Sequence, residues 1–291
     1  MNPDLKVSIK VQTAYMMYAL EGEYRVTHQA EVDEFFSAFT GAVSPFLLLD
    51  YDGTLAPFRL DRFEARPWAG VRELLTGIQR QGRTRMVIIT GRPAHEIAPL
   101  LGLDPALEVW GLHGAEHLGP DGQRELEYGS LAAQNILNNL RETLNANSLG
   151  GRFEDKANGV VMHWRGASPS KARLIEKKAC ALFEPFAGNN GLFLLEFEAG
   201  VELRVGSDKG GAVAKILAEA DANGQGAGPV AYLGDDFTDE AAFRAVNSAG
   251  PHGLSVLVRR QSRETAAQVW LRPPADLREF LQRWLLAAAR Q

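Results

Sequence analysis

PFLLLDYDGTL, residues 45–55, is the most informative stretch of this 291-residue sequence. Its apolar half predicts a buried strand, after which the chain presents Asp50 and Asp52 and then turns at Gly53. Carboxylates two residues apart on an extended chain can lie close together, so each raises the cost of ionising the other. A metal cation or a cationic side chain would relieve that repulsion. The pattern therefore indicates a nucleophile and an acid/base beside a divalent cation.

The composition is that of a soluble globular protein with a substantial core. Apolar residues make up 45% and charged residues 23% of the chain, which has room for one large domain or two moderate ones. A net charge of −5 argues against a general nucleic-acid binder, although an anionic substrate needs only a few local cations. Cys180 is the only cysteine, so no disulfide forms within the chain, which fits a cytoplasmic location. No apolar run approaches the roughly 20 residues of a membrane span, so no membrane partner is expected.

The first 28 residues carry no chemistry that the sequence identifies. Their apolar run Tyr15–Leu20 lacks a clear basic start and is followed at once by acidic residues, which argues against a secretory signal peptide. Residues 31–39 have apolar side chains at helical spacing and predict an amphipathic helix. We therefore expect residues 1–40 to be an N-terminal extension with a helix.

Strand and helix signals alternate in two separate parts of the chain. In the first part the predicted strands cover residues 47–49, 86–89 and 109–110, and the predicted helices cover residues 71–79 and 95–101. In the second part helices over residues 211–220 and 277–288 accompany strands over residues 230–233 and 254–258. This alternation predicts a Rossmann-like α/β core, a parallel sheet with helices on both faces.

The pattern changes between these two parts. Helices are predicted over residues 131–144 and 171–183, a strand over 160–165, and a hairpin of strands over 192–197 and 201–205. Such a run is typical of a small α+β domain inserted into a larger one. We therefore expect a catalytic core at residues 41–118 and 206–291, with an inserted cap at residues 119–205.

Polar side chains follow three of the core strands directly. They are Asp50 and Asp52 after the first, Thr90 and Arg92 in TGR after the second, and Asp235 and Asp236 after residues 230–233. Ligands of an open α/β sheet bind outside the carboxyl ends of its strands, so these groups should be neighbours. Lys209 opens a helix before the last of these strands and brings an ammonium to the same edge. Carboxylates, a hydroxyl and an ammonium together predict a phosphate site with a hard cation.

Each of these features has a structural alternative when it is taken singly. The Asp-x-Asp-Gly sequence is also found in solvated turns, and Thr90 is also a good helix cap. Lys209 would usually be a surface lysine, and acidic residues at 235–240 would also suit a helix N-terminus. Their occurrence together and in order favours the catalytic interpretation.

Four segments resemble those of the haloacid dehalogenase-like phosphohydrolases, and in particular the trehalose-6-phosphate phosphatases among them. The matching segments are LDYDGTL (49–55), TGR (90–92), GLHGAE (111–116) and GDDFTDE (234–240), with cap segments at 154–156, 163–165 and 198–204. The resemblance covers about residues 41–258. It implies a core of the haloacid dehalogenase type with an inserted cap that serves as a lid over the site.

The resemblance also implies a mechanism. Asp50 would attack phosphorus in line and form an aspartyl-phosphate. Asp52 would protonate the leaving sugar oxygen and then take a proton from the hydrolytic water. Thr90 and Lys209 would contact the phosphoryl oxygens during transfer.

The cofactor implied is Mg²⁺. It would bind the Asp50 carboxylate, the Asp52 backbone carbonyl and Asp235. Asp236 and Asp239 would hold the metal's waters or Lys209 from a second layer of contacts.

The implied partner is a small sugar phosphate, gripped by polar side chains. In the cap these are Glu154, Lys156, His163, Arg165, Glu198, Glu202 and Arg204, and from the core Arg92, His113 and Glu116 would complete the pocket. His163 and Arg165 alternate with Met162 and Trp164, so they should share one face of the cap sheet. Functional coupling to a trehalose-phosphate synthase is a further expectation.

Other functions stay open at this point. HGAEH at residues 113–117 formally matches a zinc-protease pattern, but its glycines favour a loop over the required helix. A related phosphatase acting on sucrose phosphate, glucosylglycerol phosphate or mannosyl-3-phosphoglycerate is the nearest alternative. A phosphosugar mutase of the same superfamily and a non-catalytic sugar-phosphate binder are the others.

Overall fold

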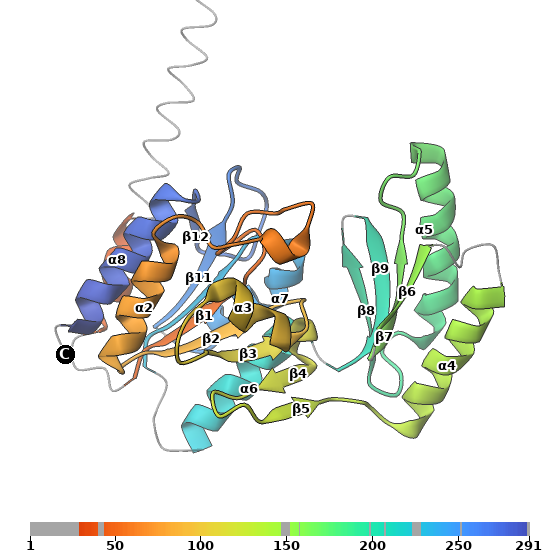
Figure 1. The fold of residues 1–291 in the computed structure, drawn as a ribbon, viewed down its shortest axis with the longest axis horizontal. Helices are drawn as coiled ribbons and strands as arrows, with labels where there is room; N and C mark the ends of the chain where they lie inside the picture. Colours follow the sequence, from red (N-terminus) through yellow and green to blue (C-terminus); the bar gives the residue numbers. More distant parts are fainter. Residues whose placement is uncertain are drawn as a thin grey trace, which may run out of the picture.

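The computed structural model describes residues 29–39, 44–146, 152–156, 158–197, 199–206, 208–222, 228–250 and 252–289. The expectations for residues 1–28 and for Glu198 lie outside these ranges. Figure 1 shows a larger α/β body on the left and a smaller α+β body on the right, each built around its own sheet.

Among the described residues, the larger sheet has eight strands in the order β12-β11-β10-β1-β2-β3-β4-β5. The parallel strands are β1 (Phe46–Leu49), β2 (Arg85–Ile89), β3 (Glu108–Gly111), β10 (Val230–Gly234), β11 (Gly253–Val258) and β12 (Val269–Leu271). Two antiparallel strands, β4 (Glu116–Leu118) and β5 (Arg124–Leu126), extend one edge. The strand order therefore places β1, with its two aspartates, between β10 and β2.

Helices cover both faces of this sheet, as the alternating pattern predicts. On one face lie α2 (Val71–Gln81), α3 (Ile97–Leu101), α8 (Ala275–Ala289) and the helix at residues 29–37; on the other lie α6 (Lys209–Ala222) and α7 (Glu240–Asn247). Alternate residues of β1 serve the two faces: Leu47 and Leu49 pack with the first group, and Phe46 and Leu48 with the second. Burial on both faces explains why these strands are continuous apolar runs.

The helix at residues 29–37 is anchored to α8 by aromatic side chains. The ring of Phe39 meets that of Trp284 edge-on at 4.9 Å, and Phe35 and Phe36 contact the same indole. The N-terminal helix predicted from the apolar spacing is therefore present and packs on the core.

Short 3-10 helices follow several strands. They are η1 (Arg62–Glu64), η2 (Ala94–Glu96), η3 (Leu112–Gly114) and η6 (Phe237–Asp239), with η5 (Glu184–Phe186) in the smaller body. Three of these, η2, η3 and η6, begin within five residues of the ends of β2, β3 and β10, so they shape the edge of the sheet where the predicted site residues lie.

The smaller body is a sheet with two helices on one side. Its strands are β6 (Phe153–Lys156), β7 (Gly159–His163), β9 (Gly200–Val205) and β8 (Leu192–Phe197) in that order, and its helices are α4 (Leu131–Ala146) and α5 (Pro169–Phe183). Leu137, Met162 and Leu203 belong to the apolar cluster between helices and sheet. The opposite face of the sheet is turned toward the core (Figure 1).

Some sequence-based boundaries differ from the structure. The strand predicted over residues 160–165 ends at His163, because Trp164 pairs with the Ala199 carbonyl and the chain then turns at Gly166, whose φ is +71°. The strands β4, β5, β6 and β12 were not predicted, since each is only three or four residues long and all but β12 contain charged residues. β5 pairs with β4, so the larger sheet continues past residue 118, where we placed the start of the cap. The division into core and cap stays our proposal.

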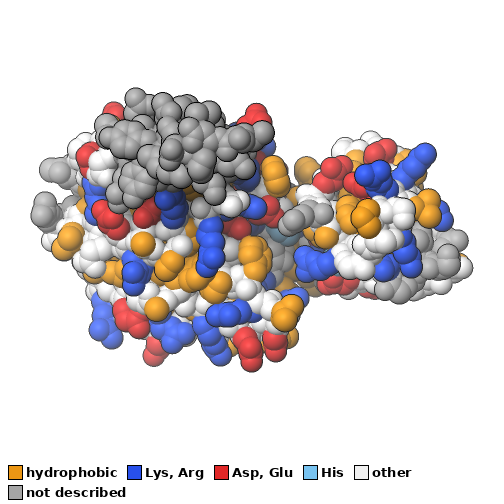
Figure 2. All heavy atoms as spheres, turned by 90° about the horizontal axis from the view of Figure 1, so that it is seen from above, with side chains coloured by type: hydrophobic (Ala, Val, Ile, Leu, Met, Phe, Trp, Pro, Cys, Tyr) orange, Lys and Arg blue, Asp and Glu red, His pale blue; other side chains and the backbone are white. Residues whose placement is uncertain are grey.

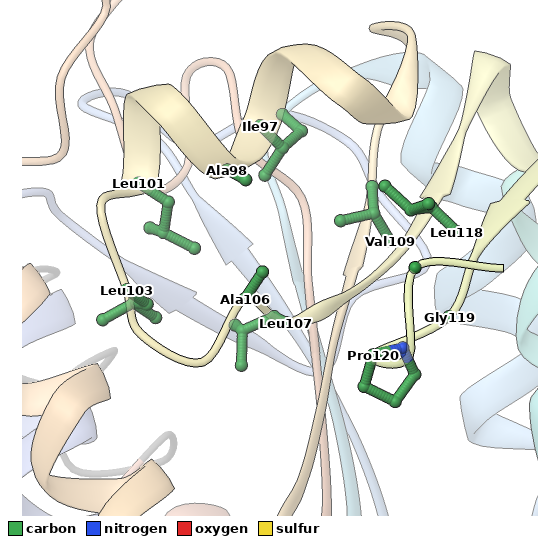
Figure 3. A pocket seen from close by; sticks show the side chains of 11 residues that line it. Ile97, Ala98, Leu101, Leu103, Ala106, Leu107, Val109, Leu118, Gly119 and Pro120 are labelled. Atoms are coloured by element: carbon green, nitrogen blue, oxygen red, sulfur yellow. The ribbon is translucent and has the colours of Figure 1, made fainter. Parts of the chain in front are cut away.

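Two surface features bear on function. Acidic and basic side chains are interspersed on the face seen in Figure 2, where a narrow waist joins the two bodies. A pocket between α3 and the β3–β4 hairpin is lined only by apolar residues and glycines, including Leu101, Val109 and Leu118 (Figure 3). Such a lining does not suit a phosphate.

Within the described residues, every helix is too short or too polar to cross a bilayer.

Candidate active site

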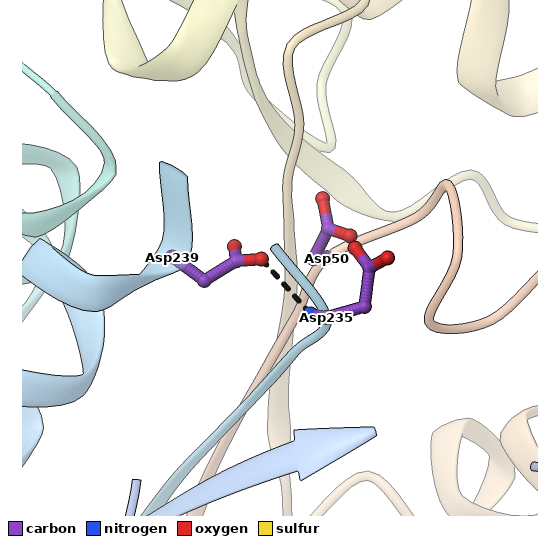
Figure 4. Close-up of side chains that lie close together, drawn as sticks. All are labelled: Asp50, Asp235 and Asp239. Carbon is purple, nitrogen blue, oxygen red and sulfur yellow. Dashed lines mark hydrogen bonds between the residues drawn. The ribbon is translucent and has the colours of Figure 1, made fainter. Parts of the chain in front are cut away.

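The carboxyl ends of β1, β10 and β2 bring the predicted catalytic residues together. Leu49 is in register with Leu233 of β10 and with Ile88 of β2, so the residues that follow these three strands meet at one edge of the sheet. One carboxylate oxygen each from Asp50, Asp235 and Asp239 lies within 4.8 Å of the others (Figure 4). Residues 185 positions apart in the sequence thus form one buried acidic cluster.

Gly53 is required for this close approach. Its φ is +84°, in the region that favours glycine, and its N–H donates to the Ala56 carbonyl at 2.7 Å to close the turn. A Cβ atom at this position would lie 2.0 Å from the Asp235 carboxylate. The absence of a side chain at Gly53 therefore leaves the space that the Asp235 carboxylate, which follows β10, occupies.

Lys209 lies inside the cluster. Its Nζ donates to Asp50 Oδ1 and to Asp239 Oδ1, both at 2.7 Å, and its side chain is buried. Burial alone would lower the pKa of Lys209, but the carboxylates of Asp239 and Asp50 outweigh burial and raise that pKa above its ordinary value. The ammonium is therefore charged and fixed between two carboxylates.

Asp239 is saturated by donors and acts as the support of the cluster. Its Oδ1 also accepts from the Tyr232 hydroxyl at 2.6 Å, and its Oδ2 accepts from the backbone N–H groups of Asp235 and Asp236, each at 2.9 Å. Asp236 caps η6 and accepts from the Phe237 N–H at 2.7 Å. These contacts fit the supporting role expected for Asp239, whereas Asp236 has the contacts of a helix cap.

The electrostatics of the cluster favour an added cation. Burial raises the pKa of Asp50 to about 7, with the Lys209 ammonium opposing the effect, and burial together with Asp50 raises the pKa of Asp235 well above its ordinary value. Asp50 Oδ2 also accepts from the Thr54 hydroxyl at 3.0 Å. Within the described part of the chain, the Lys209 ammonium contacts two of the three carboxylates, those of Asp50 and Asp239, so a divalent cation would further stabilise the ionised forms of the cluster.

Asp52 and Arg92 face each other at the open side of the cluster. Arg92 Nε donates to Asp52 Oδ2 at 2.5 Å, and a terminal nitrogen of the same guanidinium donates to Asp52 Oδ1 at 2.6 Å. The Arg92 side chain is 8% exposed and that of Asp52 is 26% exposed. Arg92 was expected to line the sugar pocket, but in this structure its side chain is engaged with the predicted acid/base.

His113 lies in η3, directly after β3, and Glu116 is the first residue of β4. His113 has a φ of +54°, and its ring lies so close to Gly91 that a Cβ there would be 2.6 Å from Nε2. Its Nδ1 is buried without a hydrogen-bond partner among the described residues. Burial is the larger cause, and the positive charge of the nearby Arg204 the second, that holds the pKa of His113 well below the usual range. A neutral imidazole with an unpaired nitrogen is suited to a ligand hydroxyl.

Glu116 has a different environment from the one expected. It is fully buried, and its two oxygens accept from the Ala94 N–H at 2.7 Å and from Arg124 Nε at 2.5 Å. These contacts tie β4 to η2, just beyond the TGR sequence. Substrate binding by Glu116 stays a prediction, and its present contacts are those of a supporting residue.

Thr90 ends β2 inside the protein. Its N–H donates to the Trp110 carbonyl at 2.9 Å, its carbonyl accepts from the His113 N–H, and its hydroxyl accepts from the Arg92 N–H at 3.2 Å. The residue is 1% exposed. Thr90 therefore lies at the edge of the sheet, and its contact with a phosphoryl group stays a prediction.

Five of the predicted sugar-binding residues of the cap share one face of its sheet. Across β6, β7 and β9, Glu154 is in register with Val161, which is in register with Glu202. In the same way Lys156 is in register with Gly159, which is in register with Arg204. Because side chains alternate along a strand, Glu154, Lys156, His163, Glu202 and Arg204 all lie on the face opposite α4 and α5. That face is the one turned toward the core (Figure 1).

Two ion pairs organise this cap face. Lys156 Nζ lies 2.8 Å from Glu202 Oε2, with the Glu202 side chain 3% exposed, and His163 Nε2 lies 2.9 Å from Glu154 Oε2 in a more exposed position. Arg165 lies in the exposed turn after β7, beyond the strand whose alternation was the reason to expect it on the same face as His163. It falls outside the group because the strand has already ended.

Arg204 links the two bodies. Its buried guanidinium donates to the Leu112 carbonyl and, at 3.4 Å, to the His113 carbonyl. Burial lowers its pKa, and the neighbouring Glu202 opposes that effect. These contacts hold the carboxyl end of β9 against η3 of the larger body.

Sequence reasoning missed two contributors to the cluster. Tyr232 was treated only as part of an apolar strand, although a buried phenol needs a hydrogen-bond partner and so signals a polar neighbour. Thr54 was quoted within its motif without a role, and its distance of four residues from Asp50 gave no indication of the contact. The contacts of Tyr232 with Asp239 and of Thr54 with Asp50 depend on the three-dimensional arrangement of β10 and of the turn after β1.

The fold and the site together define a class of protein. A solved structure described as a haloacid dehalogenase-like hydrolase from Bacteroides thetaiotaomicron has the same fold, at a TM-score of 0.60 and 17% identity over 83% of this chain and 99% of that one. The α/β fold, with its mostly parallel sheet, is thus of the haloacid dehalogenase-like type.

More similar proteins narrow the family. The trehalose-phosphatase family model matches residues 48–274, and this chain belongs to that family. The trehalose-phosphate phosphatase of Mycolicibacterium paratuberculosis is 32% identical over 250 residues, which are 82% of this chain and 61% of that protein. A structure of the Aspergillus fumigatus trehalose-6-phosphate phosphatase is 26% identical, with a TM-score of 0.70 over 89% of this chain and 98% of the other. The chain spans about three-fifths of the length of the curated relatives it matches.

Proposed function

We propose that this chain hydrolyses trehalose 6-phosphate to trehalose and phosphate through an aspartyl-phosphate on Asp50. The observation that carries the proposal is the buried cluster of Asp50, Asp235, Asp239 and Lys209 at the carboxyl edge of the sheet. Family membership connects this cluster to a phosphorylated disaccharide.

The donor set of the cluster fits Mg²⁺. Its available groups are all oxygens, and the missing Cβ of Gly53 leaves the Asp235 carboxylate room beside the Asp50 motif. The Asp50 and Asp235 carboxylates and the Asp52 backbone carbonyl would hold the ion. When bound, it would neutralise charge on the phosphoryl group and help to orient it.

In the first step Asp50 is the nucleophile. Its Oδ2 is held by Thr54 and its Oδ1 by Lys209, so the carboxylate is oriented before substrate arrives. A bond forms between a carboxylate oxygen and phosphorus while the bond from phosphorus to the sugar oxygen breaks. Asp52 gives its proton to that oxygen, and Lys209 with Thr90 stabilises the charge on the transferred group.

In the second step water replaces the sugar. Its oxygen attacks phosphorus, its proton passes to the Asp52 carboxylate, and Asp50 leaves as the free carboxylate. The acyl phosphate must be protected from water until the sugar has gone, which is a role for the cap over the site. The ion pairs on the inner face of the cap would rearrange to bind the hydroxyls of the disaccharide.

Phosphate release from a panel of sugar phosphates tests the proposal directly. Trehalose 6-phosphate should be preferred over sucrose phosphate, glucosylglycerol phosphate and mannosyl-3-phosphoglycerate, with released phosphate as the measurement. Preference for another member of the panel would retain the mechanism and replace the substrate. Failure to release phosphate from every member would contradict the enzymatic proposal and favour a sugar-phosphate binder.

Two broader expectations rest on the same proposal. A cytoplasmic location would give the enzyme access to a phosphorylated sugar made inside the cell. Functional coupling to a trehalose-phosphate synthase would supply its substrate, and co-purification with that synthase would test it.

A further inference from the structure

The guanidinium of Arg92 forms a two-pronged contact with Asp52. Its Nε and a terminal nitrogen each donate to a different oxygen of the carboxylate, at 2.5 and 2.6 Å. Such paired contacts fix both the position and the plane of a carboxylate, which a single contact does not. Within the described residues, the groups that the Arg92 side chain contacts all belong to the larger body rather than to the cap.

Arg92 is itself held from behind. Its remaining terminal nitrogen donates to the Arg62 carbonyl at 2.8 Å and lies 3.6 Å from Glu96 Oε2. The guanidinium carbon lies 5.7 Å from the centre of the Tyr51 ring, which is fully buried. The guanidinium is therefore a rigid support, because turning it away would break several contacts at once.

Asp52 needs such a support for its proposed chemistry. It lies in the turn after β1, where its backbone bridges to Ala56, and its side chain reaches the open side of the buried cluster. An acid/base must bring one oxygen within hydrogen-bond reach of the reacting oxygen. A displacement of about 1 Å at a reacting group can cost on the order of 100-fold in rate.

We propose that Arg92 is a positioning residue that holds the Asp52 carboxylate for proton transfer. This inference rests on the proposed function and deepens it. As the bond from phosphorus to the sugar oxygen breaks, the held Asp52 gives its proton to that oxygen; as water then attacks phosphorus, Asp52 recovers a proton. Arg92 forms no bond to the substrate in either step.

Leaving-group dependence distinguishes this role from substrate binding. A sugar alkoxide needs a proton as it departs, whereas p-nitrophenolate leaves without one because its nitro group delocalises the charge. The parameter kcat/KM covers only the steps up to departure of the leaving group, so hydrolysis of the intermediate does not enter it. Comparing kcat/KM for trehalose 6-phosphate and p-nitrophenyl phosphate therefore isolates the proton transfer by Asp52.

Arg92→Lys is the informative variant, because it keeps the charge and loses the paired contact. We expect kcat/KM for trehalose 6-phosphate to fall about 10- to 100-fold, and the fall for p-nitrophenyl phosphate to be at least about fivefold smaller. Falls that differ by less than this factor would overturn the proposal. Glu96→Gln, which weakens the support of the guanidinium, should change the same ratio in the same direction by a smaller factor and serves if Arg92→Lys does not fold.

Arg85→Lys is the matched control. Arg85 forms an equivalent paired contact with Glu108 at the opposite end of the same strand, so this variant measures the general cost of losing such a contact. It should reduce kcat/KM for the two substrates by equal factors.

A double-mutant cycle supplies an independent measurement. In an Asp52→Asn background, Arg92→Lys should change kcat/KM for p-nitrophenyl phosphate by less than about threefold, because the group that Arg92 positions has lost its acid/base function. The same cost in both backgrounds would show that Arg92 acts independently of Asp52.

If the wild type does not hydrolyse trehalose 6-phosphate, the proposed substrate fails, and the sugar phosphate that the panel identifies takes its place in the same comparison.

Discussion

Arg85 and Arg92 lie at the two ends of β2, and each binds a carboxylate through two nitrogens. At the amino end Arg85 contacts Glu108 at 2.9 and 3.0 Å, and at the carboxyl end Arg92 contacts Asp52 at 2.5 and 2.6 Å. The Glu108 side chain is 9% exposed, against 26% for Asp52. An arginine paired with a carboxylate thus occurs in a closed setting and in a more open one.

The two carboxylates differ in what else they contact. Glu108 also accepts from the Trp110 indole and contacts His117 Nε2, each at 3.1 Å, so its oxygens are committed to the fold. Asp52 faces the open side of the acidic cluster and keeps surface available to a substrate. The comparison suggests that a paired arginine stabilises the fold where the carboxylate is enclosed, and we propose that it positions the carboxylate for chemistry where the carboxylate is partly exposed. Substitutions at the carboxyl edge should therefore change activity, and those at the amino edge should change stability.

Asp50→Asn should show the largest effect at the carboxyl edge. Phosphate release should fall by at least about 1,000-fold, because an amide does not attack phosphorus. The folded-state pKa of Asp50, about 7, is raised above its ordinary value, so its contribution to stability is present at low pH and is lost as the pH rises through 7. At pH 8 with chelator, the variant should therefore melt at the same temperature as the wild type or higher. Retained turnover would remove Asp50 as the nucleophile.

Chelation should have the next largest effect at the same edge. EDTA should reduce phosphate release by more than about 100-fold, and added Mg²⁺ should restore it. Mg²⁺ at about 100 times its dissociation constant should also stabilise the wild type by about 2.7 kcal/mol, measured as a rise in melting temperature. Asp235→Asn should abolish that rise, and a rise that survives the substitution would place the metal elsewhere.

Glu108→Gln tests the amino edge. Loss of the buried charge should lower the free energy of unfolding by about 1–3 kcal/mol, because Arg85 and His117 lose their charged partner. Thermal or urea unfolding measures this change, while kcat/KM for the preferred sugar phosphate should stay within about twofold of wild type. A large loss of activity with unchanged stability would reverse the comparison between the two edges.

Lys156→Met extends the comparison to the cap. Removing the partner of Glu202 should raise KM for the disaccharide phosphate about tenfold, since a buried carboxylate then faces the ligand unpaired. Lys177→Met, on the exposed side of α5, is the matched control for loss of a cap lysine. An equal change in KM for both variants would argue against a specific sugar contact.

Acid pH should produce the smallest effect. Burial alone would raise the pKa of Glu108, but hydrogen bonds from His117 and Arg85 lower it to about 2. Its folded pKa is below the unfolded value, so its stabilisation is present above about pH 4.5 and is lost as the pH falls toward 2. Wild-type stability should decline through this interval, and Glu108→Gln should show a shallower decline. Parallel pH curves for the two proteins would contradict the shift.

Local sequence patterns predicted the elements and the residues of the catalytic edge. Apolar runs such as residues 46–49 must be buried on both faces, and a parallel sheet gathers the residues that follow its strands at one edge. The sequence alone therefore predicts that Asp50, Thr90 and Asp235 lie at the same edge. Short or polar strands such as β6 and β12 carried too little periodicity to predict.

The amino-acid sequence by itself determined the fold class, the sheet edge at which the candidate site lies and the order of its motifs, because these depend on hydrophobic periodicity and on the residues that end each strand. Only the tertiary structure decided which side chains are paired. Arg92 contacts Asp52, Glu116 is enclosed, and Arg204 contacts the carbonyls of η3. Such partners lie 22 to 92 residues apart, and their meeting depends on how turns and short helices pack over the sheet edge, which no local pattern records.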